Sequence, residues 1–399
     1  MCVRTALYSV YTAAMTSFAF ARSEADGWSA IAKALAMDLA LPPLPEGVTR
    51  LGFLYATDNV ADDFATLVTF LRQTTGIEHW VGSIGMGICW GHQGAGGEAF
   101  GRPAAAVLIA DMPTDSFSVL PLLGESVNEV PDDLLGWMAN ATPPFGIVHG
   151  DPMNAAVTGL IEQLSLAMEN ATLEVPGFLV GGLTSSRGAH YQLAEDVLGG
   201  GLSGVLFAPD VEVATGLTQG CAPVGPAHRV TDCMDNVIMT LNGESALNVF
   251  KDDIGELLAR DMNRVAGYIH AAFPVEGSDT GDYVVRNLVG VDPERGWLGV
   301  GGDVQTGDWV LFVRRDPASA EEDLKRMVNN LVGRLPGPAK GGLYFSCVAR
   351  GPSLFGAEGR EMEIVQEALD DVPIVGFFGQ GEISNNRLYG YTGVLALFL

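Results

Sequence analysis

Basic residues are scarce in this chain of 399 residues, which has 22 lysine and arginine residues against 48 acidic ones and a formal net charge of -26. Only four of the 22 are lysines, and the arginines are scattered along the sequence. No basic stripe is available to neutralise the phosphates of a nucleic acid, and anionic membranes are disfavoured for the same reason. We therefore expect neither partner, and we attribute the acidity to solubility.

Motifs for metals, nucleotides and disulfides are also missing. The five cysteines are widely spaced, and the sequence contains no CxxC and no HExxH, which argues against a disulfide framework and a structural zinc site. No Gly-Lys-Ser/Thr occurs, and no glycine cluster gives GxGxxG between a strand and a helix. The sequence therefore predicts no metal and no cofactor.

Long hydrophobic runs are lacking as well, since no segment approaches the ~20 apolar residues of a membrane-spanning helix. Residues 1–21 end in Ala19-Phe20-Ala21, a pattern that a signal peptidase reads. The alternative, which the interrupting polar residues and the cysteine usage favour, is an extra segment that leads into a first strand around residues 16–21. Separate cysteines fit a reducing compartment, so we expect a cytoplasmic protein.

What is present describes a globular chain. Hydrophobic residues make up 48% and charged residues 18%, and the 51 glycines follow no collagen-like period. The length suggests two domains. A first helix is expected over residues 23–41, with Ser23 as its N-cap and two prolines at its end.

After that helix, a unit of strand, helix, Val-Gly turn and strand recurs three times. The expected segments are 51–55, 60–73, 81–82 and 104–110 in the first copy, 145–148, 153–168, 178–182 and 204–208 in the second, and 343–348, 358–370, 375–376 and 390–398 in the third. Such a repeat builds mixed sheets with helices packed on one face. The predicted fold class is therefore α/β, or mixed α+β, with two domains.

The middle of the chain has another pattern. Residues 229–241 alternate between apolar and polar, Asn242-Gly243 is a strong turn signal, and a helix begins at residue 246. Three more strands are expected at 283–291, 297–300 and 309–315. This β-rich region follows a loop at 220–227 that holds two prolines and two glycines. We predict an N-terminal extension over 1–22, one domain over 23–223 and another over 224–399.

The last sixty residues carry most of the chemistry. A strand ends in Cys347 and leads into Arg350-Gly351, and after a helix a glycine-dense turn holds Glu382. This layout predicts that a thiol, a guanidinium and a carboxylate meet at one edge of one sheet. Because strand ends and glycine turns let the backbone approach a small ligand closely, we expect a polar pocket there.

These C-terminal elements resemble the FIST domain family, which has an N-terminal and a C-terminal half. Residues 345–351 look like its C-x-x-R-G element, and residues 376–383 look like its G-F-x-x-x-G-E-[IL] element. Residues 229–247 are similar to the start of FIST-C, with Asn242 and Ser245 in place of the usual Asp and Pro. The resemblance extends over residues 23–399, with looser motifs in the N-terminal half.

The resemblance implies a sensory module for intracellular signal transduction that binds a small ligand such as an amino acid or a related small carboxylate, and that works with a signalling protein partner. Arg350 would grip a carboxylate by two parallel hydrogen bonds, and Glu382 would hold an ammonium group. The alternative role of Arg350 is an ion pair with Glu382 or with a helix acid. The residues expected to line the site are Arg350, Glu382, Cys347, Gly351, Gly376, Phe377, Gly379, Gly381 and His92.

Two other readings stay open. Cys347 with His92 or His149 and with Glu382 would provide the residue types of a cysteine-dependent hydrolase, although their spacing adds no support. A non-enzymatic interaction scaffold would bind no small ligand and would hold a stable protein partner. We expect the sensory protein, without catalysis of its own.

Overall fold

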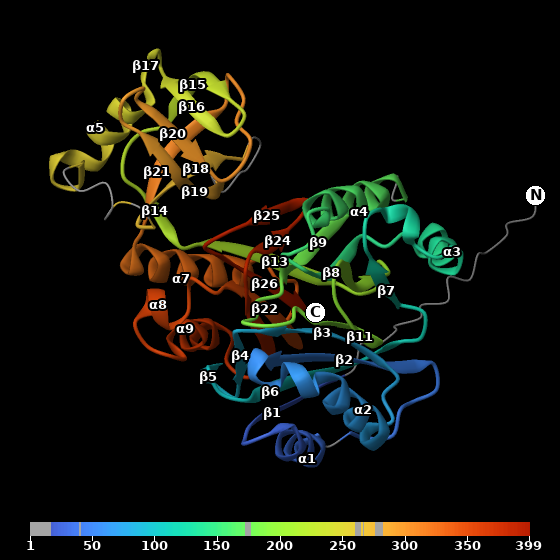
Figure 1. Cartoon of the computed structure of the whole chain (residues 1–399). Coiled ribbons are helices and arrows are strands. Elements are labelled where there is room, and N and C mark those ends of the chain that lie inside the picture. The colour runs from blue at the N-terminus through green and yellow to red at the C-terminus, as the bar shows by residue number, and fades with distance from the viewer. Residues whose placement is uncertain (1–16, 40, 172–176, 260–264, 266, 276–281) are drawn as a thin grey trace, which may run out of the picture.

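The computed structural model of the chain describes residues 17–39, 41–171, 177–259, 265, 267–275 and 282–399. These residues form a large body of three sheets that carries a small barrel at one side (Figure 1). The large body is built from three consecutive units with the same order of elements: strand, helix, strand, helix, strand, hairpin and strand. The predicted fold class, with mixed sheets, packed helices and a repeated unit, is confirmed.

The first two units are continuous in sequence. Unit 1 contains β1 (Phe18–Glu24), α1 (Trp28–Asp38), β2 (Val48–Thr57), the 3-10 helix η1 (Asp58–Asp63), α2 (Phe64–Thr75), β3 (His79–Gly85), β4 (Gly87–His92), β5 (Ala95–Phe100) and β6 (Ala104–Pro113). Unit 2 contains β7 (Phe117–Leu123), η2 (Val127–Glu129), α3 (Asp132–Ala141), β8 (Phe145–Gly150), α4 (Val157–Ala171), β9 (Phe178–Leu183), β10 (Gln192–Ala194), β11 (Asp196–Leu198) and β12 (Leu202–Phe207).

The third unit is interrupted by the barrel. Unit 3 contains β13 (Val213–Gln219), α7 (Pro317–Gly333), β22 (Gly341–Cys347), α8 (Pro352–Phe355), α9 (Arg360–Leu369), β23 (Ile374–Gly379), β24 (Glu382–Ser384), β25 (Arg387–Tyr389) and β26 (Thr392–Phe398). Figure 1 shows the helices of each unit on the outside of its sheet.

Each sheet of the large body has the same centre. Two strands of each unit are parallel neighbours: β2 and β3, β8 and β9, and β22 and β23. The last strand of each unit pairs antiparallel with the earlier of these two, which gives the orders β6-β2-β3, β12-β8-β9 and β26-β22-β23. The opening strands β1, β7 and β13 pair with β6, β12 and β26. Three strand–helix–strand units with parallel strands therefore underlie the repeat that the sequence indicated.

The hairpins are exchanged between the units. The β4–β5 hairpin of unit 1 extends the sheet of unit 3 through β23, and the β10–β11 hairpin of unit 2 extends the sheet of unit 1 through β3. The β24–β25 hairpin of unit 3 extends the sheet of unit 2 through β9. The exchange is cyclic, so that each sheet is completed by a neighbouring unit.

The Val-Gly pairs lie inside strands, and the prediction of turns at these positions was wrong. Across the parallel strands the register pairs Leu54 with Gly82, Val148 with Gly181 and Tyr344 with Gly376. A Cβ on each glycine would lie 1.8, 1.8 and 1.7 Å from the carbonyl oxygen of its partner. The repeat is thus a packing requirement between two backbones, and glycine satisfies it because it has no side chain.

The three units meet at side chains from equivalent strand positions. Tyr55, His149 and Phe345 each follow the residue that faces the repeated glycine, and their ring centroids lie 5.6 to 6.1 Å apart. The Tyr55 hydroxyl and His149 Nε2 are 3.1 Å apart, and burial lowers the pKa of His149 to about 3. The centre of the large body is therefore a packed core with a neutral histidine.

The β-rich region expected in the middle of the chain is a closed barrel. Its elements are β14 (Cys221–Pro223), β15 (His228–Met234), β16 (Val237–Leu241), β17 (Glu244–Ser245), α5 (Ala246–Ala259), β18 (Ile269–Pro274), β19 (Tyr283–Asp292), β20 (Trp297–Val300) and β21 (Trp309–Arg315). Pairing runs from β18 through β19, β20, β16, β15 and β21 and returns to β18. The turn at Asn242-Gly243 is confirmed, since both residues have positive φ.

The expected first helix begins later than predicted. Ser23 lies in β1, opposite Ala105 of β6, and the helix starts at Trp28 after Gly27, whose φ is 85°. The sheet pairing of β1 overrides the capping pattern of Ser23, and Ala19–Ala21 are part of the same strand. No helix in the described ranges is long and apolar enough to cross a membrane.

Candidate functional site

The end of β22 opens onto a cavity of about 380 Å³ between unit 3 and the barrel. Unit 3 lines it with residues 347–349, Gln380 and residues 388–391, while the barrel contributes residues 285–287, Val289 and Gly301. Cys347 is the last residue of β22, and it is 6% exposed. The cavity therefore lies at the strand end that the sequence indicated.

Behind this strand end lies a fully buried ion pair. Arg350 Nε donates to Glu361 Oε1 at 2.8 Å, and both side chains are 0% exposed. Glu361 also accepts from the Tyr344 hydroxyl at 2.7 Å, from Ser346 Oγ at 3.0 and 3.1 Å, and from the amide of Gly351 at 3.0 Å. This carboxylate is paired and fully hydrogen-bonded, which is the condition for a charge to be stable in a protein interior. Of the two alternatives for an ion pair of Arg350, the structure contains the one with a helix acid.

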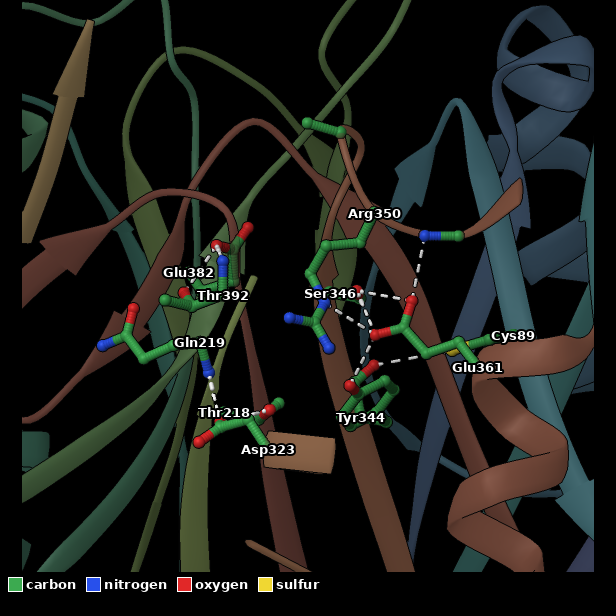
Figure 2. A network of polar contacts seen from close by, with 12 residues as sticks. Cys89, Thr218, Gln219, Asp323, Tyr344, Ser346, Arg350, Glu361, Glu382 and Thr392 are labelled. Atoms are coloured by element: carbon green, nitrogen blue, oxygen red, sulfur yellow. Dashed lines mark hydrogen bonds and ion pairs between the residues drawn. The ribbon is translucent and has the colours of Figure 1, made fainter. Parts of the chain in front are cut away.

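Only one edge of the Arg350 guanidinium is used. Both Nη atoms are buried, and neither has a hydrogen-bond partner among the described residues. A Cβ on Gly220 would lie 2.4 Å from the carbonyl oxygen of Tyr391 and 3.2 Å from Nη1 of Arg350, so only glycine allows this close approach. Figure 2 shows the group between Glu361 on one side and Glu382 with Thr392 on the other. The four N–H groups of the Nη atoms thus lack an acceptor among the described residues, and the guanidinium carbon lies 5.2 Å from the centroid of the Phe355 ring.

Glu382 provides an opposite group on that side. Its Oε2 accepts from the Thr392 hydroxyl at 2.7 Å and from the Thr392 amide at 3.1 Å, whereas Oε1 has no partner among the described residues. Burial raises the pKa of Glu382 to about 8, against the lowering effects of Thr392 and Arg350. Burial therefore favours the neutral form of this carboxyl.

The sequence predicted that Glu382 and Cys347 lie at the edge of one sheet, and this prediction was wrong. Glu382 begins β24, which crosses to the sheet of unit 2 and pairs with β9, so that Glu382 lies opposite Gly182. The side chain nevertheless stays close enough to Cys347 and Arg350 to shift the pKa of both. The hairpin exchange, and not a common sheet edge, brings the three groups together.

Cys347 is a protonated thiol at neutral pH. Burial raises its pKa most, and the neighbouring Glu382 raises it further. A thiol nucleophile needs a lowered pKa or an adjacent base. His149, which could have been such a base, is hydrogen-bonded to Tyr55 in the central core, and burial keeps it neutral. The chemistry at Cys347 thus suits a lining group better than a nucleophile.

His92 lies at the other end of the sheet. Gly91, next to it in β4, faces Ile374 at the start of β23, whereas Cys347 faces Gly379 at the end of β23. Five residues of extended strand separate the two positions, which corresponds to roughly 16 Å. His92 packs against Phe20 instead, at 5.1 Å between ring centroids.

The remaining predicted residues fall into two groups. Phe377 belongs to the central core, where its ring stacks on Tyr55 at 5.4 Å, and Gly376 is the repeated glycine of β23. Gly351, Gly379 and Gly381 flank the site, and their role in it is to shape the backbone. Gly351 has a φ of 51°, and the carbonyl of Gly381 accepts from the amide of Leu183 at 2.8 Å.

The cavity also contains residues that the sequence did not indicate, from unit 3 and from the barrel. Tyr391, which has a φ of 63°, donates from its hydroxyl to Asn287 Oδ1 at 2.8 Å, and its ring lies 4.4 Å from that of His270. Arg286 lines the cavity beside them. A tyrosine in the left-handed region costs free energy, and such positions gather at functional sites. Within the described residues, no group of three His, Cys, Asp or Glu side chains could hold a metal ion.

Two domain families and several proteins are similar to this chain. Residues 50–244 match the FIST N domain, and residues 246–385 match the FIST C domain. The uncharacterized protein Rv0628c of Mycobacterium tuberculosis is 29% identical over 371 residues, which cover 89% of this chain and 93% of that protein. The uncharacterized protein Mb0898c of Mycobacterium bovis is 32% identical over 248 residues, which cover 59% of this chain and 64% of that protein.

Proposed function

The chain belongs to the FIST family, with one N and one C domain, and from this premise we propose that it senses a small ligand in the cavity beside Cys347. FIST domains are sensory modules that bind small ligands in signalling. The ligand we propose is an amino acid or a related small carboxylate. Its binding would be read by a signalling protein partner.

One observation carries the proposal, namely the unused edge of the Arg350 guanidinium, which is fully buried behind Cys347 and does not itself line the cavity. Burying polar N–H groups without partners costs about 1–3 kcal/mol each, so such groups are retained where something satisfies them. A carboxylate matches the two Nη atoms of Arg350 in both charge and geometry. Glu382 Oε1 offers an acceptor for a donor group of the same ligand.

Thermal unfolding against a panel of amino acids and small carboxylates tests the proposal. A compound that binds only the native state raises the unfolding midpoint. At a ligand concentration of a hundred times Kd, it increases the free energy of unfolding by about 2.7 kcal/mol. We expect a hit that Arg350→Ala and Glu382→Gln both weaken. Arg360→Ala is the matched control, because this arginine lies in the same region with a 30% exposed side chain and pairs with Glu321.

Arg350→Ala leaves Glu361 buried without its cation, so the variant will also unfold at a lower temperature without ligand. Each variant is therefore compared with its own ligand-free midpoint, and Glu382→Gln, which keeps the shape of the protonated carboxyl, is the milder second test. A panel that shifts no midpoint in the wild type would sink the sensory proposal in favour of the scaffold.

The alternative of a cysteine-dependent hydrolase has weaker support, because the thiol pKa is raised and neither His92 nor His149, the two histidines it invoked, lies at Cys347. Slow alkylation of Cys347 by iodoacetamide at neutral pH would agree with the sensory proposal. We also propose a cytoplasmic location, since Cys89, Cys221, Cys233 and Cys347 are unpaired thiols.

A further inference from the structure

The charged side chain that lines the cavity beside Cys347 is a cation, and it comes from the barrel. Among the described side chains that line this cavity, Arg286 of β19 is the one with a charge. The other polar lining residues, Asn287, Gln380, Cys347, Tyr389 and Tyr391, carry no formal charge, and the remaining walls are aliphatic or backbone. In a chain with a net charge of -26, a cavity lined by a single cation is a local exception.

Arg286 lacks a strong partner in the structure. Its Nη1 donates only to two neutral carbonyls, those of Val285 at 3.3 Å and Leu388 at 3.4 Å. No ion pair joins it to any carboxylate of the described residues, although it also lines a second cavity that contains Glu162, Asp303 and Asp308. Burial lowers the pKa of its guanidinium. A partly desolvated cation with long contacts to neutral acceptors gains more from an anion than an exposed arginine does.

The lining offers no matching group for an ammonium ion. No acidic side chain of the described residues lines the cavity, and Glu382 lies behind Cys347, where burial favours its neutral form. An α-ammonium group bound there would lose its hydration without gaining an anionic partner. The apolar part of the cavity, which includes Val285, Val289 and Val348, suits a small aliphatic chain.

We propose that Arg286 binds the carboxylate of the ligand, and that the ligand is a small aliphatic monocarboxylate or 2-oxo acid without an α-ammonium group. This inference rests on the proposed function of ligand sensing, but it moves the carboxylate contact from Arg350 to Arg286, so that Arg350 supports the site from behind. Such a ligand contacts the barrel through Arg286 and unit 3 through residues 347–349. It therefore ties the barrel to the large body.

The test compares matched ligands by isothermal titration calorimetry on the full chain. The probes are 4-methylpentanoate, 4-methyl-2-oxopentanoate and leucine, which share one side chain and differ only at the α-carbon. We expect the first two to bind at least tenfold more tightly than leucine. Arg286→Gln should weaken their binding at least tenfold, and Arg286→Lys should restore part of it.

Arg295→Gln is the matched control, because this barrel arginine is exposed, lies 5.0 Å from the Trp297 ring and does not line the cavity. Tighter binding of leucine, or unchanged binding by Arg286→Gln while Arg350→Ala loses it, would overturn this inference and leave the sensory proposal standing. No binding of any of the three probes or of the wider amino-acid panel would overturn both.

Discussion

At the scale of single residues, the buried site holds more acids than cations. Glu98, Glu361 and Glu382 are all buried within reach of one another's charge or of Arg350, which is the cation that pairs with Glu361. One ion pair satisfies one carboxylate, so the other two are forced toward the neutral form. Burial, followed by the charge of Glu361, raises the pKa of Glu98 to about 8.

The raised pKa of Glu98 predicts a loss of stability at alkaline pH. A carboxyl with a higher pKa in the folded state binds its proton more tightly there, so its contribution is complete below its unfolded pKa and is lost as the pH rises through the folded value. Between pH 6.5 and 8 this loss amounts to about 1.5 kcal/mol for Glu98. Glu98→Gln should remove that part of the decline in urea unfolding free energy.

The comparison starts at pH 6.5 because His149 and His270, whose pKa values are lowered to about 3 and about 4, oppose the decline at lower pH. Glu363→Gln is the control, since this glutamate of α9 has a 54% exposed side chain. An equal slope for wild type and Glu98→Gln would show that Glu98 ionises as it does in the unfolded chain.

The sequence identified the key arginine but could not select its partner. Helix α9 carries Glu361, Glu363 and Glu367 within one and a half turns, and only Glu361 faces the core. Glu363 and Glu367 pair with Arg360 at the surface instead. All three are glutamates on one short helix, so the sequence does not distinguish them as partners of Arg350. Which one faces Arg350 depends on the rotation of α9 against β22, which is a tertiary contact.

At the scale of elements, the sequence located the repeat and misread one part of it. Three strand–helix–strand units were predicted from apolar periodicity and are present. The shared Val-Gly was interpreted as a turn because glycine most often marks one. In the structure the glycine faces a neighbouring carbonyl at the centre of a parallel pair, and this close approach cannot be read from one strand alone.

The repeated glycine gives a prediction about backbone packing. Gly376→Ala places a Cβ 1.7 Å from the carbonyl oxygen of Tyr344, so β22 and β23 must separate. We expect a loss of at least about 3 kcal/mol, in the range of the larger overpacking effects. The measurement is the midpoint of chemical unfolding.

Gly136→Ala is a matched control for this change. Gly136 lies within α3, and a Cβ there would meet nothing within 4 Å. The same substitution in a helix interior should stabilise the protein by about 0.5–1 kcal/mol. A Gly376→Ala protein as stable as the wild type would mean that the strands accommodate the methyl group and that the repeat has another origin.

At the scale of the whole molecule, the units are interlocked in a way that local patterns do not encode. Each hairpin lies within one unit in sequence but completes the sheet of another unit. The pairing partner of β4, β10 or β24 is therefore set by the assembled core. The sequence predicted a boundary near residue 223, yet β13, which precedes it, pairs with β26 at the end of the chain. The site inherits this exchange, because Glu382 begins an exchanged hairpin.

Interlocking predicts that the large body folds as one piece. A cut at residues 208–212, between β12 and β13, gives fragments 1–210 and 211–399. Fragment 1–210 lacks the β24–β25 hairpin for its second sheet, and it leaves side chains such as Tyr55 and His149 without Phe345. We expect fragment 1–210 alone to lack cooperative unfolding and a near-ultraviolet circular dichroism signal, and fragment 211–399 alone to show only the transition of its barrel. The mixture should regain the full transition.

The barrel provides the contrasting case within the same chain. Residues 221–315 close their own ring of strands around a separate apolar core that includes Phe250, Phe312 and Leu298. Because its pairing and its core are internal, this segment should unfold cooperatively by itself. If fragment 1–210 unfolded cooperatively alone, the exchanged hairpins would be attachments to units that are already stable. If the large body instead folds only when both fragments are present, it is one rigid body to which the barrel is attached as a separate part. A ligand at the junction would then act between these two parts.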